Sequence, residues 1–249
     1  MAILQFKDLL EARAHFGHKK QNWNPKMQPY IYKQKNGLHI IDLRKSVELL
    51  KEAYKAVTEI AARGGKFLFV GTKKQAQSII EEAAKRVGAS YVKDRWVGGT
   101  LTNFNVIRRS IEKYNKLCEE IEAESFKELP QKIQSRMLRQ QVKMRKYFDG
   151  IKNMESLPDL LYVVDVTQEE NAVKEANLLE IPVVAIVDTN SDPETVDYPI
   201  PANDDAIESI RLITSVIETA IAEGRKHFEE EEQLRKKEEL EEVKEEGKE

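Results

Sequence analysis

Short apolar runs without polar alternation set the strongest limit on how this chain folds. Lys66 to Val70, Leu160 to Val164 and Val183 to Val187 lack the alternating polar residues of a half-exposed strand, so each is expected to be buried on both faces. Tyr91-Val92 is predicted as a further strand. Helical patterns lie between these strands, and right-handed crossovers place such helices on both faces of a parallel sheet. The sequence therefore predicts an α/β fold with a mainly parallel, Rossmann-like sheet.

Turn and cap residues indicate where other helices and strands of this α/β body begin and end. Gly71-Thr72 is predicted to open a helix directly after a strand. Near the N-terminus, Tyr30 to Tyr32 and Leu38 to Ile41 flank the turn residues Asn36-Gly37, a pattern typical of a β-hairpin. Ser46 is expected to cap the helix that follows this hairpin.

A long insertion interrupts the alternation of strands and helices. More than sixty residues separate Tyr91-Val92 from Leu160, and within them two apolar stripes repeat at intervals of 4 and 3 residues. The first stripe is Ile107, Ile111, Tyr114, Cys118 and Ile121, and the second is Ile133, Met137, Gln140, Met144, Tyr147, Ile151 and Met154. Two such stripes, joined near Ser125 to Pro130, predict an inserted antiparallel coiled-coil helical hairpin.

Charge is distributed unevenly along the chain. The net charge of the 249 residues is −3, but residues 225–249 hold 7 Lys and Arg against 11 Asp and Glu, which leaves 33 against 32 for residues 1–224. The acidic end has too few apolar residues to bury a fixed face. We therefore predict an α/β body of residues 1–104 plus 157–224, a hairpin of residues 105–156, and a charged tail of residues 225–249 that is disordered or a frayed helix.

Several classes of protein have little support in this sequence. No run of about 18 apolar residues is present, and the start lacks the features of a signal peptide, so a soluble, cytoplasmic protein without membrane contact is expected. The single cysteine, Cys118, leaves no internal disulfide. His15 and His18 have no third ligand nearby. Six aspartates could hold Mg²⁺ but are more typical of turns and helix caps: Asp165, Asp188, Asp192, Asp197, Asp204 and Asp205. No metal or other cofactor is predicted.

A nucleotide-binding enzyme is the alternative to a binding protein. The turn Gly71 to Lys74 lies between a strand and a helix, where a phosphate could bind, and acidic loops follow other strands. Neither the three spaced glycines of a dinucleotide site nor the Walker pattern is present. Because no catalytic motif supports this alternative, we predict that the chain is not an enzyme.

A segment near the N-terminus combines cations with aromatic side chains. Gly17 to Lys35 contains five lysines and no Asp or Glu, a composition typical of nucleic-acid contacts. Its candidate RNA-binding residues are Lys19, Lys20, Trp23, Asn24 and Lys26. Alternatively, Trp23 covers an edge of the core and the lysines are only solvated.

The segment Arg95 to Phe104 has two adjacent glycines beside an arginine and a tryptophan. Gly98-Gly99 permit backbone angles that are closed to other residues, and such a loop can lie against a phosphate or a base. We predict that Arg95, Trp96 and Asn103 face RNA. A tight turn in which Trp96 plugs the core is the alternative.

The second helix of the predicted hairpin carries a high density of positive charge. Between Gln131 and Lys152 there are seven cations and one carboxylate, Asp149. Five cations repeat at 4, 3, 4, 3, one residue before the apolar stripe, and we call them the basic stripe: Lys132, Arg136, Arg139, Lys143 and Lys146. The basic stripe is predicted to bind RNA. The alternative is that it pairs with the glutamates of the first helix, which are Glu119, Glu120, Glu122 and Glu124.

Motifs along most of the chain resemble a single family. Arg95-Trp96-Val97-Gly98-Gly99-Thr100-Leu101-Thr102-Asn103-Phe104 is similar to the pattern of the second protein of the small ribosomal subunit, the ribosomal protein S-two family. Further similar motifs follow the family's order: Gly17-His18, Trp23 to Met27, Ile40 to Leu43, Leu68 to Ala76, Leu157 to Asp159, Ile181 to Val184, Asp188 to Pro193 and Ile200 to Asp205. The resemblance covers about Ile3 to Ala222.

The resemblance implies a structural constituent of the small ribosomal subunit that supports translation and is ribosome-associated. It implies contacts of the body and the hairpin with small-subunit rRNA, and contacts with neighbouring ribosomal proteins, including docking of the large S-one protein. Four further cations complete the candidate RNA-binding residues: Lys73 and Lys74 within the Leu68 to Ala76 motif, and Arg108 and Arg109 one turn of helix after Phe104.

Overall fold

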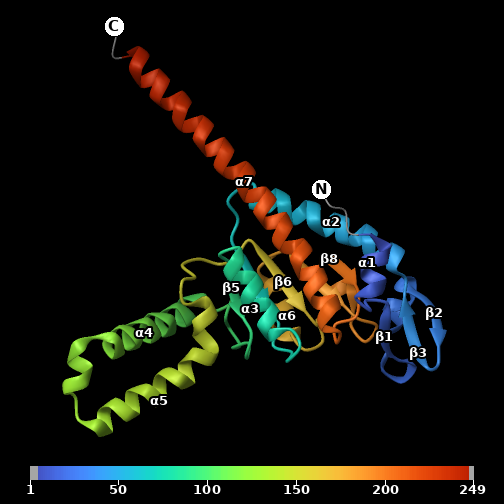
Figure 1. Ribbon diagram of the computed structural model, residues 1–249, viewed down its shortest axis with the longest axis horizontal. Helices are drawn as coiled ribbons and strands as arrows, with labels where there is room; N and C mark the ends of the chain where they lie inside the picture. Colours follow the sequence, from blue (N-terminus) through green and yellow to red (C-terminus); the bar gives the residue numbers. More distant parts are fainter. Residues whose placement is uncertain (1–4, 247–249) are drawn as a thin grey trace.

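A five-stranded parallel sheet is the centre of the computed structural model, which describes residues 5–246 and the side chains through residue 233. The strand order is β5-β4-β6-β7-β8, and every neighbouring pair is parallel (Figure 1). The strands are β4 (Phe67–Val70), β5 (Ser90–Val92), β6 (Leu160–Val164), β7 (Val183–Val187) and β8 (Tyr198–Pro201). The predicted α/β fold with a parallel sheet is confirmed.

Helices cover both faces of this sheet and enclose two cores (Figure 1). The first core lies under α2 (Leu43–Ala61), α3 (Gln77–Arg86) and α7 (Ile207–Glu246), and the second under α6 (Glu170–Leu178). Within β4, Phe67 and Phe69 belong to the first core, whereas Leu68 and Val70 belong to the second. A strand with a core on each face needs apolar residues at every position, which explains its unbroken apolar run.

Three local predictions about the body are wrong. The edge strand β8 is missing from the predicted strands because its two prolines interrupt the apolar pattern, and proline is tolerated at sheet edges. The helix α3 begins at Gln77 rather than at Gly71-Thr72. Asp42, not Ser46, caps α2 by accepting a 3.0 Å hydrogen bond from the Arg44 backbone N–H, while the Ser46 hydroxyl donates to the carbonyl oxygen of Pro201.

A smaller antiparallel sheet lies beside the parallel one. It contains β1 (Phe16–Lys19), β2 (Ile31–Lys35) and β3 (Leu38–Ile41) in the order β1-β3-β2. The predicted hairpin between β2 and β3 is confirmed, because Asn36 and Gly37 both have positive φ, as a two-residue hairpin turn requires. Three short helices flank this sheet: α1 (Phe6–Glu11), η1 (Lys20–Asn22) and η2 (Pro25–Tyr30).

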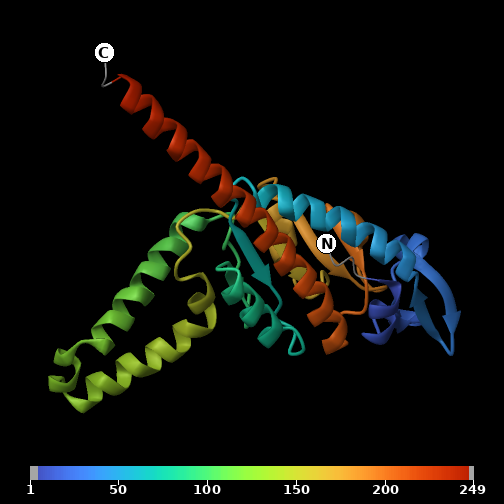
Figure 2. The same cartoon turned by 45° about the horizontal axis from the view of Figure 1, so that its top comes forward.

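The insertion forms a helical hairpin that projects from the body (Figures 1 and 2). It consists of α4 (Phe104–Glu122), η3 (Glu124–Glu128), α5 (Gln131–Phe148) and η4 (Asp149–Ile151). On α4 the predicted positions Ile107, Ile111 and Tyr114 are buried. On α5 the pattern differs: Phe148 is buried in place of Tyr147, and Ile133 is 44% exposed. The hairpin is therefore present, but a regular coiled-coil seam is not.

The helix α7 continues the body into the acidic tail. The Arg225 guanidinium donates to the Val87 carbonyl oxygen, and the Phe228 ring packs against Gly64. The segment predicted to be disordered or a frayed helix is helical through Glu246. Its residues 247–249 lie outside the described residues. Within the described part of the chain, no helix has the length and apolar character needed to cross a membrane.

Candidate nucleic-acid interface

One carboxylate from α6 organises the loop from Arg95 to Phe104. Glu175 is 8% exposed, and its oxygens accept hydrogen bonds from the Trp96 indole N–H (2.9 Å) and from the backbone N–H groups of Gly99 (2.8 Å), Leu101 (3.0 Å) and Thr102 (3.1 Å). Burial alone would raise the pKa of Glu175, but these bonds outweigh burial and hold that pKa below its usual value. The loop is therefore fixed by an ionised side chain.

The same carboxylate holds the side chain of Trp96. The indole packs against the second core and donates its N–H to Glu175, so it is half-buried. That Trp96 faces RNA stays a prediction, and a turn in which Trp96 covers the core stays its alternative. Arg95 and Asn103 are exposed on the same loop and have no ion pair or side-chain bond among the described residues.

Three of the five candidates near the N-terminus have structural roles. The Trp23 ring stacks on His39 with centroids 5.0 Å apart, and Asn24 accepts a 3.0 Å bond from the Lys26 backbone N–H at the start of η2. The Lys26 ammonium lies 2.8 Å from Asp192 and 2.7 Å from Glu194. Lys19 and Lys20 are exposed and form no ion pair with any described residue.

Lys73 is also engaged inside the body. Its ammonium lies 2.6 Å from Asp204, 2.6 Å from Asp205 and 3.3 Å from Asp165, and its side chain is 16% exposed. Burial would lower the pKa of Lys73, but the charges of these carboxylates outweigh burial and raise it. Lys73 is therefore neutralised internally by three carboxylates. Its neighbour Lys74 is exposed and has no ion pair among the described residues.

The same edge of the sheet brings together three possible metal ligands. Single ligand atoms of His18, Asp188 and Asp204 lie within 4.8 Å of one another, and Oδ2 of Asp204 is buried without a hydrogen-bond partner among the described residues. The hydrogen bond to Asp188 raises the pKa of His18 to about 9, and burial raises the pKa of Asp204 to about 7. An imidazole with two carboxylates fits the ligand preferences of Zn²⁺. His15, considered as a partner of His18, is not part of this group.

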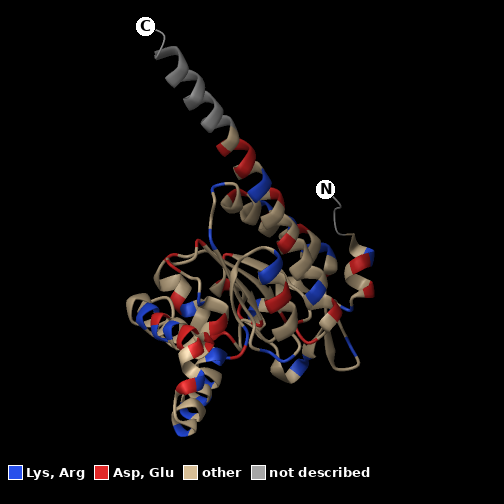
Figure 3. Cartoon of the chain, turned by 60° about the vertical axis from the view of Figure 1, so that its left-hand side comes forward, with Lys and Arg blue, Asp and Glu red and all other residues tan. Residues whose placement is uncertain are grey.

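The basic stripe remains free of internal partners. Its five members are all exposed, and none forms an ion pair among the described residues. The alternative of pairing with the glutamates of α4 is therefore wrong for the isolated chain. Met144, Tyr147 and Phe148 of α5 pack against the second core, whereas the basic stripe lies on a different, exposed side of the helix. Figure 3 shows Lys and Arg gathered along the hairpin.

The two arginines at the start of α4 differ from each other. Arg108 lies 3.4 Å from Glu112 one turn along the helix, although both side chains are largely exposed. Arg109 is exposed and has no ion pair among the described residues. Arg109 thus joins Arg95 and Asn103 near the base of the hairpin as an available polar group.

Glu175 is not predicted from the sequence as a functional residue. Its signal is its position, because Ala172, one turn before Glu175 on α6, and Ala176, the residue directly after it, are both fully buried. A glutamate on a buried face is costly unless it is fully hydrogen-bonded. Such a residue marks a place where another segment must supply donors.

Comparison with known proteins assigns the chain to a family. The family described as ribosomal protein S2 matches residues 9–224. The "Small ribosomal subunit protein uS2" of Dictyoglomus thermophilum is 54% identical over 239 residues, which cover 96% of this chain and 97% of that protein. The protein of the same name from Fusobacterium nucleatum is 51% identical over 231 residues, 92% and 93% of the two chains. This chain belongs to the ribosomal protein S2 family.

Proposed function

We propose that this chain is a structural protein of the small ribosomal subunit that binds small-subunit rRNA through the basic stripe of α5. The observation that carries the proposal is that Lys132, Arg136, Arg139, Lys143 and Lys146 are exposed along one side of a projecting helix and have no carboxylate partner among the described residues. Cations of this kind release counterions when they contact phosphates, which favours binding to RNA. The names of the relatives support the same role.

Further contacts with rRNA are assigned to exposed polar groups of the body. Arg95, Asn103 and Arg109 lie near the base of the hairpin, and Lys19, Lys20 and Lys74 lie on the body. The loop contacts depend on Glu175, because this carboxylate fixes the backbone that carries Arg95. Preorganised groups lose less conformational entropy on binding than mobile ones.

The enzyme alternative is disfavoured by the turn on which it depends. Lys73 in the Gly71 to Lys74 turn is surrounded by Asp165, Asp204 and Asp205, and these carboxylates would repel the phosphates of a nucleotide at this edge of the sheet. The family is one of ribosomal proteins. We therefore assign a structural role and no catalytic one.

Partners and cellular location follow from the proposed role. Neighbouring ribosomal proteins, including the large S-one protein, and a cytoplasmic, ribosome-associated location are supported by the resemblance of the sequence motifs. Fractionation of a lysate on a sucrose gradient tests this part. The chain should sediment with small subunits at modest salt, and the S-one protein should be depleted from subunits that lack the chain.

The basic stripe is tested by reversing three of its charges. Arg139→Glu, Lys143→Glu and Lys146→Glu together should weaken binding to small-subunit rRNA at least tenfold. The slope of log affinity against log salt should fall by about 2 to 3, because each phosphate contact adds about 0.7 to 0.9. Filter binding over a range of KCl concentrations measures both quantities.

A matched control separates local contacts from overall charge. Lys7→Glu, Lys51→Glu and Lys55→Glu change the net charge by the same amount at exposed positions of α1 and α2. The control should change affinity far less than the α5 variant. An unchanged salt slope in the α5 variant, with its helix content intact by circular dichroism, would show that the basic stripe does not contact phosphates.

A further inference from the structure

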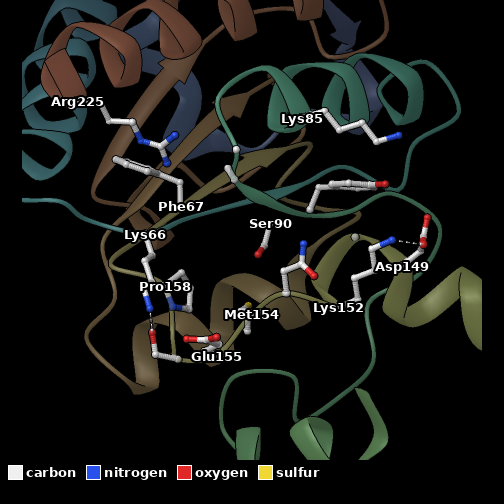
Figure 4. Close-up of a pocket in the computed structure, with 16 residues that line it drawn as sticks. Lys66, Phe67, Lys85, Ser90, Asp149, Lys152, Met154, Glu155, Pro158 and Arg225 are labelled. Atoms are coloured by element: carbon white, nitrogen blue, oxygen red, sulfur yellow. Dashed lines mark hydrogen bonds and ion pairs between the residues drawn. The ribbon is translucent and has the colours of Figure 1, made fainter. Parts of the chain in front are cut away.

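A cavity of about 620 Å³ lies where the base of the hairpin meets the body. Phe67 and Ser90, which begin β4 and β5, line it, together with residues that follow η4 and with Arg225 of α7 (Figure 4). The cavity is therefore at the amino ends of the parallel strands. The acidic cluster around Asp188 and Lys73 is at the opposite, carboxyl edge. The volume falls in the range of about 300 to 1,000 Å³ that small ligands occupy.

Two cations in the cavity have no carboxylate partner among the described residues. Arg225 donates to the Val87 carbonyl oxygen and forms no ion pair, and the Lys66 ammonium donates only to the Ser156 hydroxyl at 2.9 Å. Two further cations are already engaged, since Lys85 lies 2.7 Å from Glu81 and Lys152 lies 3.6 Å from Asp149. Figure 4 shows Arg225 and Lys66 on one side of the cavity and Lys152 on the other.

Arg225 is the lining cation best suited to hold an anion. Its guanidinium is only partly exposed, and burial lowers its pKa although the charge of Glu229 acts in the opposite direction. A guanidinium has five N–H donors in a planar fork that matches phosphate oxygens. The single bond to Val87 leaves most of these donors for a ligand.

Neutral donors complete the lining of the cavity. The side chains of Ser90 and Asn153 line it and form no hydrogen bond with any other described residue. Hydroxyl and amide groups of this kind bind ligand oxygens and orient them. Glu155 also lines the cavity and has no ion pair among the described residues. Its negative charge would weaken the binding of an anion.

We propose that this cavity binds the phosphate group of a nucleotide, either free or within an RNA strand. Arg225 and Lys66 contact the phosphate oxygens, and Ser90 and Asn153 donate hydrogen bonds to the phosphate or the ribose. The volume exceeds that of a phosphate alone and leaves room for the attached sugar. The proposal rests on the cavity and does not depend on the basic stripe of α5.

Isothermal titration calorimetry of the full chain tests this site with three probes. The probes are adenosine 5′-monophosphate, adenosine, and a short RNA oligonucleotide without a terminal phosphate. The monophosphate should bind at least tenfold more tightly than adenosine. If the oligonucleotide binds through Arg225 and the monophosphate does not, the source of the phosphate is an RNA strand. If neither binds in a manner that depends on Arg225 and Lys66, the proposal is overturned.

Variants of the lining give opposite expected effects. Arg225→Gln should weaken binding at least tenfold and Lys66→Met at least threefold, whereas Glu155→Gln should tighten it. Lys51→Met, an exposed position on α2 away from the cavity, is the matched control. Since Arg225→Gln can also loosen α7, the exposed Lys66 provides the variant that does not disturb the core. The variant with the three charge reversals on α5 should keep its affinity for the monophosphate, so failure of the basic stripe and failure of this site are distinguishable.

Discussion

The α/β body and the hairpin use positive charge in different ways. In the body, Lys73 and Lys26 are each held by two or three carboxylates. On α5, five cations are exposed and have no ion pair among the described residues. Both regions have lysines within motifs that are typical of RNA contacts, so the difference lies in what the fold brings near them.

The comparison teaches that topology decides whether a cation is available. The carboxyl ends of parallel strands meet at one edge of a sheet, and there Asp165, Asp204 and Asp205 gather around Lys73. Along most of its length, a projecting helix packs on one side only and leaves the other side to solvent. Cations on its outer side therefore remain free, whatever the net charge of the chain.

The largest expected effect comes from removing the carboxylate that fixes the loop of the body. Glu175→Ala leaves the Trp96 indole and three backbone N–H groups without their acceptor, and each unsatisfied buried donor costs about 1 to 3 kcal/mol. We expect a loss of about 3 kcal/mol or more in the free energy of unfolding, measured with urea. Glu170→Ala on the same helix removes only an exposed pair with Lys174 and should cost less than about 0.5 kcal/mol. Equal effects of the two changes would contradict the assignment to Glu175.

A somewhat smaller effect is expected at Trp96. Because the indole is half-buried against the second core, Trp96→Ala should cost about 2 to 3 kcal/mol, near the lower end for large-to-small changes in cores. Lys143→Ala on α5 should leave stability within about 0.5 kcal/mol. Thermal or urea unfolding of the two variants compares body with hairpin directly. If Trp96→Ala lowers RNA affinity while stability is unchanged, Trp96 faces RNA after all.

The smallest expected change in stability comes from removing the ion pairs of Glu81 in the body. Glu81 accepts from Lys85 at 2.7 Å and from Lys93 at 2.5 Å, and these bonds lower its pKa to about 2. Its contribution is present above the usual pKa of about 4.5 and is lost as the pH falls through about 2. With solvent screening of a partly exposed group, Glu81→Gln should cost about 1 kcal/mol at neutral pH.

The pH dependence distinguishes the two regions. The stability difference between wild type and Glu81→Gln should narrow as the pH is lowered from about 4.5, since the wild-type carboxylate then loses its ionic partners. Lys143→Gln on α5 should show no such trend, because Lys143 has no carboxylate partner among the described residues. A constant difference for Glu81→Gln at all pH values would argue against the ion pairs.

The elements that the sequence predicts correctly are those with local signals. β6 and β7 are apolar at every position because each has a core on both faces, and the turn at Asn36-Gly37 follows from residues that tolerate positive φ. β8 is harder to recognise from the sequence, because its composition is not typical of a strand. It is a strand because it pairs with β7. The seam of α5 is misjudged for a similar reason: Phe148 is buried in the second core, where its ring lies 6.4 Å from that of the distant Tyr114.

The candidate site shows the same limit more clearly. The basic stripe can be read from spacing along one helix, because no distant residue is needed to define it. The pairing of Lys26 with Asp192 spans 166 positions, and that of Lys73 with Asp204 spans 131. The contact of Glu175 with the Trp96 loop spans 79 positions. A local sequence pattern covers far fewer positions than these separations. Cations that pair with a distant carboxylate therefore cannot be told from unpaired cations before the fold is known.

The position of the hairpin between β5 and β6 has a consequence for how the chain folds. The central pairing of β4 with β6 begins near Lys66 and Asp159, which are 93 positions apart and joined by a 2.7 Å hydrogen bond. Closing so long a segment has an entropic cost that rises with its length, and distant pairings slow folding. A helical hairpin forms from nearby residues and brings its own ends together, so its early formation shortens the segment that remains to be closed. The hairpin that is proposed to bind RNA would then also speed the pairing of β4 with β6.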